Sequence, residues 1–83
     1  MIHELKILTQ YFEEVKSRRK TFEIRKNDRN FKVGDDLILK EWDGEKFTGR
    51  KIERTISYIL YDWPCGLKDG YCVMSLASCT SGI

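Results

Sequence analysis

The 83-residue chain has one proline, one histidine, six glycines and no long apolar run. A transmembrane helix needs roughly 18 or more consecutive apolar residues, so no membrane partner is expected. A secretory signal is not expected either, because His3, Glu4 and Lys6 interrupt the N-terminal segment where a signal needs an apolar core. The low proline and glycine content is not that of a linker or a fibrous protein.

The chain has three cysteines, and their spacing matches no common disulfide or metal-binding motif. Cys65, Cys72 and Cys79 form no Cys-x-x-Cys motif, and their odd number does not suit a disulfide scaffold. His3 is too distant in sequence to complete a zinc site with them. Glycine-rich phosphate-binding loops are missing as well. We therefore expect reduced thiols, a cytoplasmic location, no metal and no cofactor.

What the chain does contain is material for one small core. Ten aromatic residues and a 41% hydrophobic share argue against disorder, and 34% of the residues are charged. A chain of this length forms one domain. We expect that domain to span residues 1–83, with a packed part over about 2–77 and a frayed tail at 78–83.

Periodicity predicts a mainly β domain. Alternating patterns predict strands at 2–7, 21–26, 37–42, 47–61 and 71–76, with Asp43-Gly44 as a hairpin turn and Gly49 as a bend or bulge. A helix over about 10–18, with Thr9 as its N-cap, is predicted from helical spacing of Leu8, Tyr11, Phe12 and Val15. Five or six short strands and one clear helix near the N-terminus favour an α+β, mainly β fold, a small closed or half-closed barrel.

Positive charge is concentrated in one segment. Residues 16–32 hold eight basic and two acidic side chains, so the segment carries +6 and the remainder of the chain −4, for a total of +2. Such a segment can dock polyanions, although an ordinary solvated charge run is an equal alternative. The basic residues that we single out for ligand or RNA binding are Arg18, Arg19, Lys20, Arg25, Lys26 and Arg29.

The most informative stretch lies where the predicted helix leads into a strand. Alternation predicts that Phe22 and Ile24 face the core, while Thr21, Glu23 and Arg25 share an exposed face. A carboxylate beside a guanidinium can read a phosphate or a base edge, or it can be a surface salt-bridge ladder. Lys20 has core parity, so we expect it at the loop–strand junction or paired with a carboxylate in a cleft. Stacking surfaces for bases are expected from Tyr61 and Trp63.

These residues resemble the ASCH domain family, of PUA-like fold. The loose motif GxKxxExR of that family falls on Arg18, Lys20, Glu23 and Arg25, with Arg18 in the place of the glycine. The resemblance covers about residues 2–77 and is nearest to a short bacterial and phage branch of unknown function (DUF3850-like). It implies a β-barrel with flanking helices and a cleft beside the motif.

The resemblance also implies binding of RNA or a nucleotide-like ligand, the function that we favour. One alternative is a small amidohydrolase or ribonuclease-like enzyme acting on a nucleoside or RNA, with Lys20, Glu23 and Thr21 as catalytic residues. One branch of the family hydrolyses acetylated cytidine with a lysine, a threonine and a glutamate, but its threonine would align with Glu23 rather than Thr21. A second alternative is a non-catalytic interaction or regulatory domain, in which the motif is a fold-holding ion-pair network.

Overall fold

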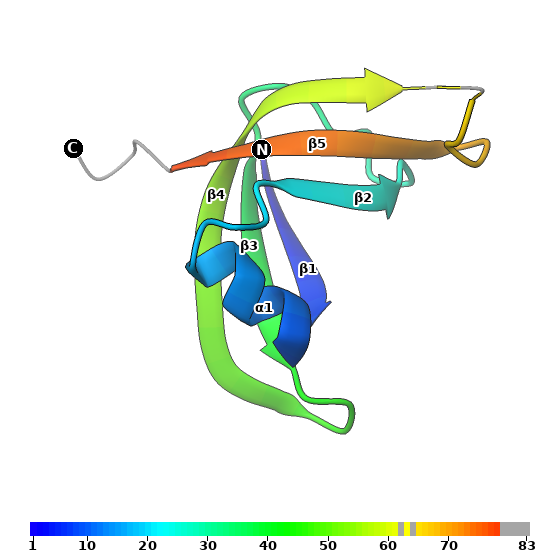
Figure 1. Ribbon diagram of the computed structural model, residues 1–83. Coiled ribbons are helices and arrows are strands. Elements are labelled where there is room, and N and C mark those ends of the chain that lie inside the picture. The colour runs from blue at the N-terminus through cyan, green and yellow to red at the C-terminus, as the bar shows by residue number, and fades with distance from the viewer. Residues whose placement is uncertain (62, 64, 79–83) are drawn as a thin grey trace.

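The computed structural model describes residues 1–61, 63 and 65–78. Over these residues it is a strongly curled five-stranded sheet with one short helix (Figure 1). The elements follow the chain in the order β1 (Ile2–Leu8), α1 (Thr9–Lys16), β2 (Phe22–Lys26), β3 (Asp36–Trp42), β4 (Phe47–Tyr61) and β5 (Tyr71–Ser78). The mainly β class with a helix near the N-terminus is confirmed.

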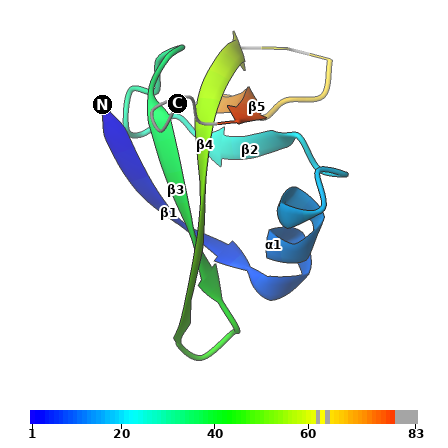
Figure 2. The same cartoon turned by 90° about the vertical axis from the view of Figure 1, so that its left-hand side faces the viewer.

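The sheet is a half-barrel. The strand order is β1-β3-β4-β5-β2, with β1 parallel to β3 and every other pair antiparallel. The edge strands β1 and β2 belong to opposite ends of this order, and the curl brings them toward each other (Figure 2). Side chains of Arg25 and Arg29 cross this seam and donate to the backbone carbonyls of Lys6 and Glu4. The seam between β1 and β2 is therefore bridged by guanidinium groups rather than by a strand ladder.

The concave side of the sheet holds the core. His3, Leu5 and Ile7 of β1 point into it, as the alternating pattern predicts. From α1, Phe12 and Val15 are buried against the sheet. The other fully buried members of the cluster are Phe31, Leu37, Leu39, Ile56, Cys72 and Met74.

The helix differs from the prediction at its start. Thr9 is its first residue rather than its N-cap; the N-cap is Leu8, which has no side-chain acceptor to offer. The Thr9 side chain instead faces the Glu41 carboxylate of β3 and helps to lower the pKa of that group. Tyr11 and Leu8, predicted on the apolar stripe, remain 44% and 46% exposed. The buried face of α1 is therefore narrower than the sequence pattern predicts, and the Leu8 and Tyr11 side chains stay accessible to solvent at its border.

The hairpin is confirmed. Asp43 Oδ1 accepts the backbone N–H groups of Glu45 and Lys46 at 2.9 Å each, which closes the turn between β3 and β4. The β3–β4 register shifts between Lys40 and Trp42, opposite a stretch in which Gly49 has φ +95°, so the predicted bulge is present. At the other end of the chain β5 runs to Ser78, two residues beyond the prediction, and residues 79–83, including Cys79, lie outside the described residues.

The facing of β2 corrects the sequence analysis. Glu23 is 4% exposed, whereas Phe22 and Ile24 are 43% and 52% exposed. Glu23 and Arg25 lie opposite Met74 and Cys72 of β5, which are buried, so the polar pair occupies the core side. The prediction assumed that the apolar face of a strand points inward. On this edge strand the inward face meets an open seam, where ion pairs fill the space.

Candidate ligand-binding site

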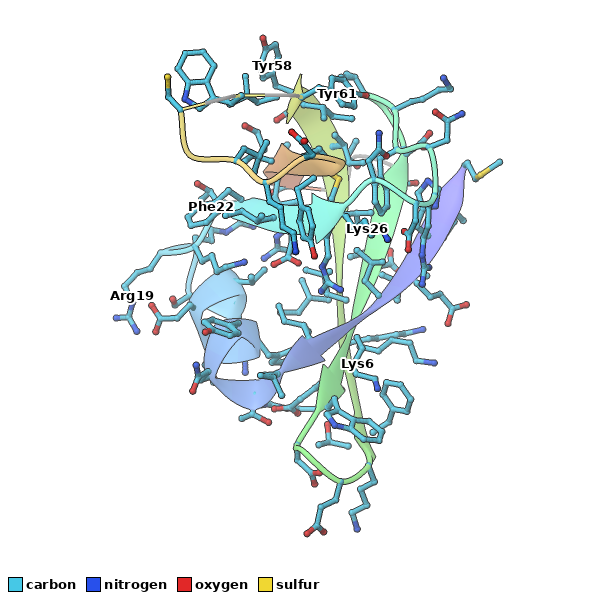
Figure 3. All side chains as sticks on the ribbon, turned by 90° about the vertical axis from the view of Figure 1, so that its right-hand side faces the viewer. Lys6, Arg19, Phe22, Lys26, Tyr58 and Tyr61 are labelled. Carbon is cyan, nitrogen blue, oxygen red and sulfur yellow. The ribbon has the colours of Figure 1, made fainter. Side chains whose placement is uncertain are left out.

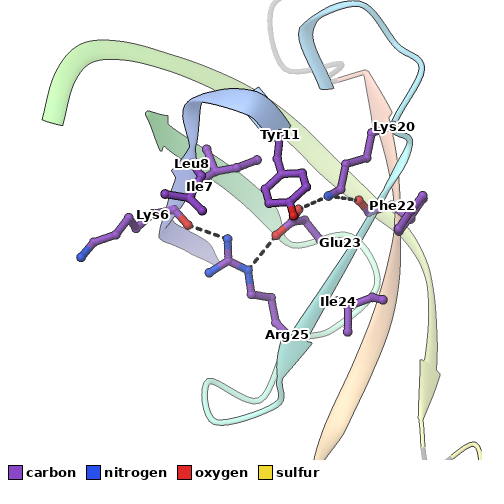
Figure 4. A pocket seen from close by; sticks show the side chains of 9 residues that line it. All are labelled: Lys6, Ile7, Leu8, Tyr11, Lys20, Phe22, Glu23, Ile24 and Arg25. Carbon is purple, nitrogen blue, oxygen red and sulfur yellow. Dashed lines mark hydrogen bonds and ion pairs between the residues drawn. The ribbon is translucent and has the colours of Figure 1, made fainter. Parts of the chain in front are cut away.

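A cleft opens where α1 and the end of β1 face β2. It has a volume of about 550 Å³ and its apolar wall comes from Ile7, Leu8, Tyr11, Phe22 and Ile24. Its charged side chains are Lys20, Arg25 and Glu23, a net charge of +1 from two cations and one carboxylate, while Lys6 contributes its backbone carbonyl and places its ammonium over the Trp42 ring. Figure 4 shows this seam cleft, with the carboxylate between the two cations. Lys20, Glu23 and Arg25 of the motif therefore lie together at the floor of a concave site, and Arg18 does not line it.

Glu23 is the centre of the seam cleft. Its Oε2 accepts from Arg25 Nε at 2.7 Å and its Oε1 from Lys20 Nζ (Figure 4). The Glu23 side chain is 5% exposed, against 17% for Lys20 and 27% for Arg25. A buried carboxylate is tolerated when cationic donors satisfy it, and here each oxygen has one.

Strand alternation alone would direct the Lys20 ammonium into the core, where an unpaired charge is unfavourable. Lys20 precedes β2, as predicted for a junction residue, and it pairs with a carboxylate in a cleft. Its ammonium also donates to the Phe22 carbonyl at 2.8 Å and lies 5.0 Å from the centre of the Phe22 ring. The Tyr11 ring centre is 5.9 Å away. The ammonium is thus held between a carboxylate and two aromatic rings.

Arg25 has two tasks. While Nε holds Glu23, Nη2 donates to the Lys6 carbonyl at 2.6 Å across the seam. Arg29 makes the equivalent contact one step along, from Nη1 to the Glu4 carbonyl at 2.7 Å. Both arginines, expected to bind ligand, also cover free carbonyl groups of the edge strand β1.

The rest of the basic segment is dispersed. Arg19 forms a two-point ion pair with Glu14 at 2.8 and 3.0 Å, and this contact lowers the pKa of Glu14. Arg18 donates to the Ser78 hydroxyl at 2.7 Å. Lys26 is exposed on β2 and does not line the seam cleft. The segment therefore does not form one uninterrupted cationic face.

Besides Arg18, Arg19, Lys26 and Arg29, three further predicted site residues lie outside the seam cleft. Thr21 is exposed, and its carbonyl accepts from the Leu76 N–H. Tyr61 donates its hydroxyl to the Phe31 carbonyl at 3.0 Å, and Trp63 is 52% exposed. None of the three lines the seam cleft. The aromatic residues that line it are Tyr11 and Phe22, both of which the sequence pattern places on apolar, core-facing positions.

Two further polar clusters lie inside the fold. Asp35 accepts from His3 Nε2 at 2.8 Å, from the Met1 amino group at 3.2 Å and from the Lys32 N–H at 3.2 Å. Burial raises the pKa of Asp35, but these donors together lower it below its usual value. His3 is buried in β1, and its ring meets that of Phe31 edge-on at 4.8 Å.

The second cluster ties α1 to the sheet. Glu41 accepts from Arg50 Nε at 2.8 Å and from the Thr48 hydroxyl at 2.5 Å, and Arg50 also pairs with Glu13 of α1. These donors, the Arg50 guanidinium first, lower the pKa of Glu41 to about 2. The Arg50 guanidinium covers the Phe12 ring at 4.6 Å. Both clusters fasten loops or the helix to the core.

Over the described residues, no group of three His, Cys, Asp or Glu side chains is placed to hold a metal ion. Cys65 is an exposed free thiol and Cys72 a buried one; burial raises the pKa of Cys72. Within the same part of the chain, no helix has the length and apolar character needed to cross a membrane.

Comparison with known proteins gives a family. Residues 2–76 match the family described as a domain of unknown function, DUF3850. The chain is also similar to a phage protein described as an uncharacterized 12.9 kDa protein in the GpA 3' region of Escherichia phage P2, with 48% identity over 64 residues. That match covers 75% of this chain and 59% of the phage protein, so the chain spans less than two thirds of its relative. The match over 2–76 takes in α1, the seam cleft and all of the sheet except the last two residues of β5, and the chain belongs to the DUF3850 family.

Proposed function

We propose that the seam cleft binds a nucleotide-like ligand, either a free nucleotide or one nucleotide of an RNA. One observation carries the proposal: a cavity of about 550 Å³ combines aromatic and aliphatic walls with a buried carboxylate held between two cations. Small-molecule sites commonly have roughly 300–1,000 Å³ and a few polar groups set among apolar walls. The chemistry of a nucleotide, a flat base beside an anion, matches that combination.

The charged side chains at the floor of the seam cleft keep hydrogen-bond donors and acceptors that a ligand can use. Lys20 uses its ammonium on Glu23 and on the Phe22 carbonyl, and an ammonium has three donors. Arg25 uses two of the five donors of a guanidinium, so the remainder can fork onto a phosphate. Each Glu23 oxygen keeps a lone pair that can accept from a base amino group or a ribose hydroxyl. Tyr11 and Phe22 provide rings for the base.

A hydrolase is the second candidate, and the geometry supports it less. Its nucleophile would be Thr21, and Thr21 does not line the seam cleft. Among the residues that the structure describes, those lining the seam cleft include no serine, threonine or cysteine. Lys20 and Glu23 remain together in the cleft, so the hydrolytic reading requires a nucleophile from water rather than from Thr21.

The test is titration with the four ribonucleoside monophosphates at low salt, followed by calorimetry or by amide chemical shifts. Lys20→Gln and Tyr11→Ala change the seam cleft, and Lys46→Gln removes the same charge at the hairpin turn. We expect Lys20→Gln to weaken binding about tenfold or more, because a charge-assisted hydrogen bond is lost. Lys46→Gln should bind as the unmodified chain does. Absence of binding at millimolar nucleotide, or equal losses in Lys20→Gln and Lys46→Gln, would overturn the proposal.

A further inference from the structure

The convex face of the sheet carries an apolar patch on β4, β5 and β2. Strand register places its members in two rows that cross the three strands. One row runs from Tyr58 through Ser75 to Phe22, and the other from Leu60 through Val73 to Ile24. Tyr58, Ile24 and Phe22 are 63%, 52% and 43% exposed. We call this surface, formed by Phe22, Ile24, Tyr58, Leu60 and Val73, the outer patch.

A bulge sets the direction of Tyr58. Ile56 pairs with Leu76, but the next paired residue, Tyr58, lies opposite Ser75, so Ser57 is an extra residue in β4. Ile56 is buried in the core, and without the insertion Tyr58 would share its side of the sheet. The irregularity thus turns a large aromatic side chain outward, onto the outer patch.

The spacing of the two rings leaves them accessible. Tyr58 and Phe22, both labelled in Figure 3, lie on strands separated only by β5. Strand spacing puts them about 10 Å apart, and the register places the small residue Ser75 between them. Two exposed rings on a sheet with a short residue between them are a surface on which successive flat groups can stack.

Two lysines lie beside the outer patch. Lys26 follows on the same side of β2 and lies opposite Tyr71, whose ring has the Lys68 ammonium 5.8 Å from its centre. Two copies of this patch would bring like charges together, which opposes self-association. A polyanion with flat apolar groups meets both the rings and the lysines.

We propose that the outer patch binds single-stranded nucleic acid that continues from the seam cleft over the edge of β2. Phe22 and Ile24 belong to both surfaces, because β2 is an edge strand and its side chains lie beside the seam cleft as well as on the convex face. The proposal rests on the proposed function, since the nucleotide in the seam cleft is taken to be part of this strand. The ligand class is therefore a polynucleotide rather than a free nucleotide.

The experiment is fluorescence anisotropy with a labelled single-stranded RNA of about a dozen nucleotides, within the site sizes of ~4–16 nucleotides known for such surfaces. The nucleoside monophosphates are titrated in parallel. Tyr58→Ala removes a ring of the outer patch and leaves the seam cleft unchanged, and Tyr58→Phe keeps the ring. We expect Tyr58→Ala to weaken oligonucleotide binding by about 5- to 150-fold, the effect of one lost stacked base, and to leave monophosphate binding unaltered. Tyr58→Phe should bind as the unmodified chain does.

The outcomes separate the two proposals. If Tyr58→Ala binds the oligonucleotide normally, the outer patch proposal is wrong and the seam cleft proposal stands. If oligonucleotide binding depends on Tyr58 while no monophosphate binds, the outer patch holds nucleic acid and the seam cleft proposal fails. If neither ligand binds, both fail. Analytical ultracentrifugation of the same variants tests whether a second copy of the chain occupies the outer patch. If the unmodified chain is a dimer that Tyr58→Ala dissociates, and no RNA binds, the outer patch is a dimer interface and the proposal is overturned.

Discussion

Arg25 reaches across the open side of the half-barrel and donates to the Lys6 carbonyl at 2.6 Å. The same guanidinium donates to Glu23 at 2.7 Å, so one side chain joins the edge strand β1, the edge strand β2 and the buried carboxylate. A ligand that binds Glu23 or Arg25 therefore contacts the residues that hold the seam. Binding and the stability of the seam are coupled through this guanidinium.

Arg25→Ala is expected to lower the free energy of unfolding by about 2 kcal/mol, since it removes two charge-assisted hydrogen bonds and leaves Glu23 with one cation. Arg25→Lys keeps a charge near Glu23 but cannot span both partners, so its loss should be intermediate. Arg29→Ala is the matched control, since it removes one contact to the Glu4 carbonyl and should cost about 1 kcal/mol. Urea unfolding measures all three. Equal losses for Arg25→Ala and Arg29→Ala would contradict the dual role of Arg25.

Glu23→Gln is expected to be more damaging, at roughly 3 kcal/mol, because it leaves two part-buried cations without their carboxylate. Glu14→Gln breaks an exposed ion pair with Arg19 and should cost far less. Thermal melting monitored by circular dichroism compares the two. A nucleotide phosphate placed between Lys20 and Arg25 would replace part of the lost charge, so ligand should stabilise Glu23→Gln if the proposed function is right.

Local patterns predicted much of this fold. The five strands, the inward face of β1 and the Asp43 turn follow from alternation and turn chemistry, which act over a few residues. The pairing of Lys20 with a carboxylate in a cleft followed from the cost of burying a lone ammonium.

The facing of β2 could not be predicted in the same way. It depends on the curl of the whole sheet, which makes the inward side of β2 a seam lined by the Lys6 carbonyl rather than a closed core. Alternation along β2 and helical spacing along α1 place Phe22 and Tyr11 on apolar faces, and both faces meet the open seam rather than a closed core. Alternation indicates that two faces differ; it does not indicate which of them meets the core when the strand lies at an edge.

Arg18 occupies the motif position of a glycine and adopts φ +67°, in the left-handed region. For a residue with a side chain this costs about 1 kcal/mol, which the hydrogen bond to Ser78 partly offsets. Arg18 also lies near Arg54, whose pKa is lowered by burial and by this second cation. Arg18→Gly should therefore match or exceed the unmodified chain in Tm. Arg18→Val, with a branched side chain at positive φ, should melt about 4–8 °C lower for each kcal/mol lost. A Tm for Arg18→Gly as low as that of Arg18→Val would exclude this account of the turn.

Low pH should lower the free energy of unfolding by protonating Glu41, which with Arg50 holds α1 on the sheet. The pKa of Glu41 falls from 4.5 to about 2 in the folded chain, because the donors Arg50 and Thr48 outweigh burial. A folded-state pKa below the unfolded one stabilises the protein above pH 4.5, and this contribution is lost as the pH falls toward about 2. Urea unfolding from neutral pH down to about 2 should show the difference between the unmodified chain and Glu41→Gln shrinking across that interval. Thr48→Val removes one donor, so the pKa of Glu41 should be lowered less, and its acid-sensitive contribution should be smaller and fully lost at a higher pH than in the unmodified chain. A difference between the unmodified chain and Glu41→Gln that stays constant over the interval would mean that the Arg50–Glu41 pair does not set the acid limit of the fold.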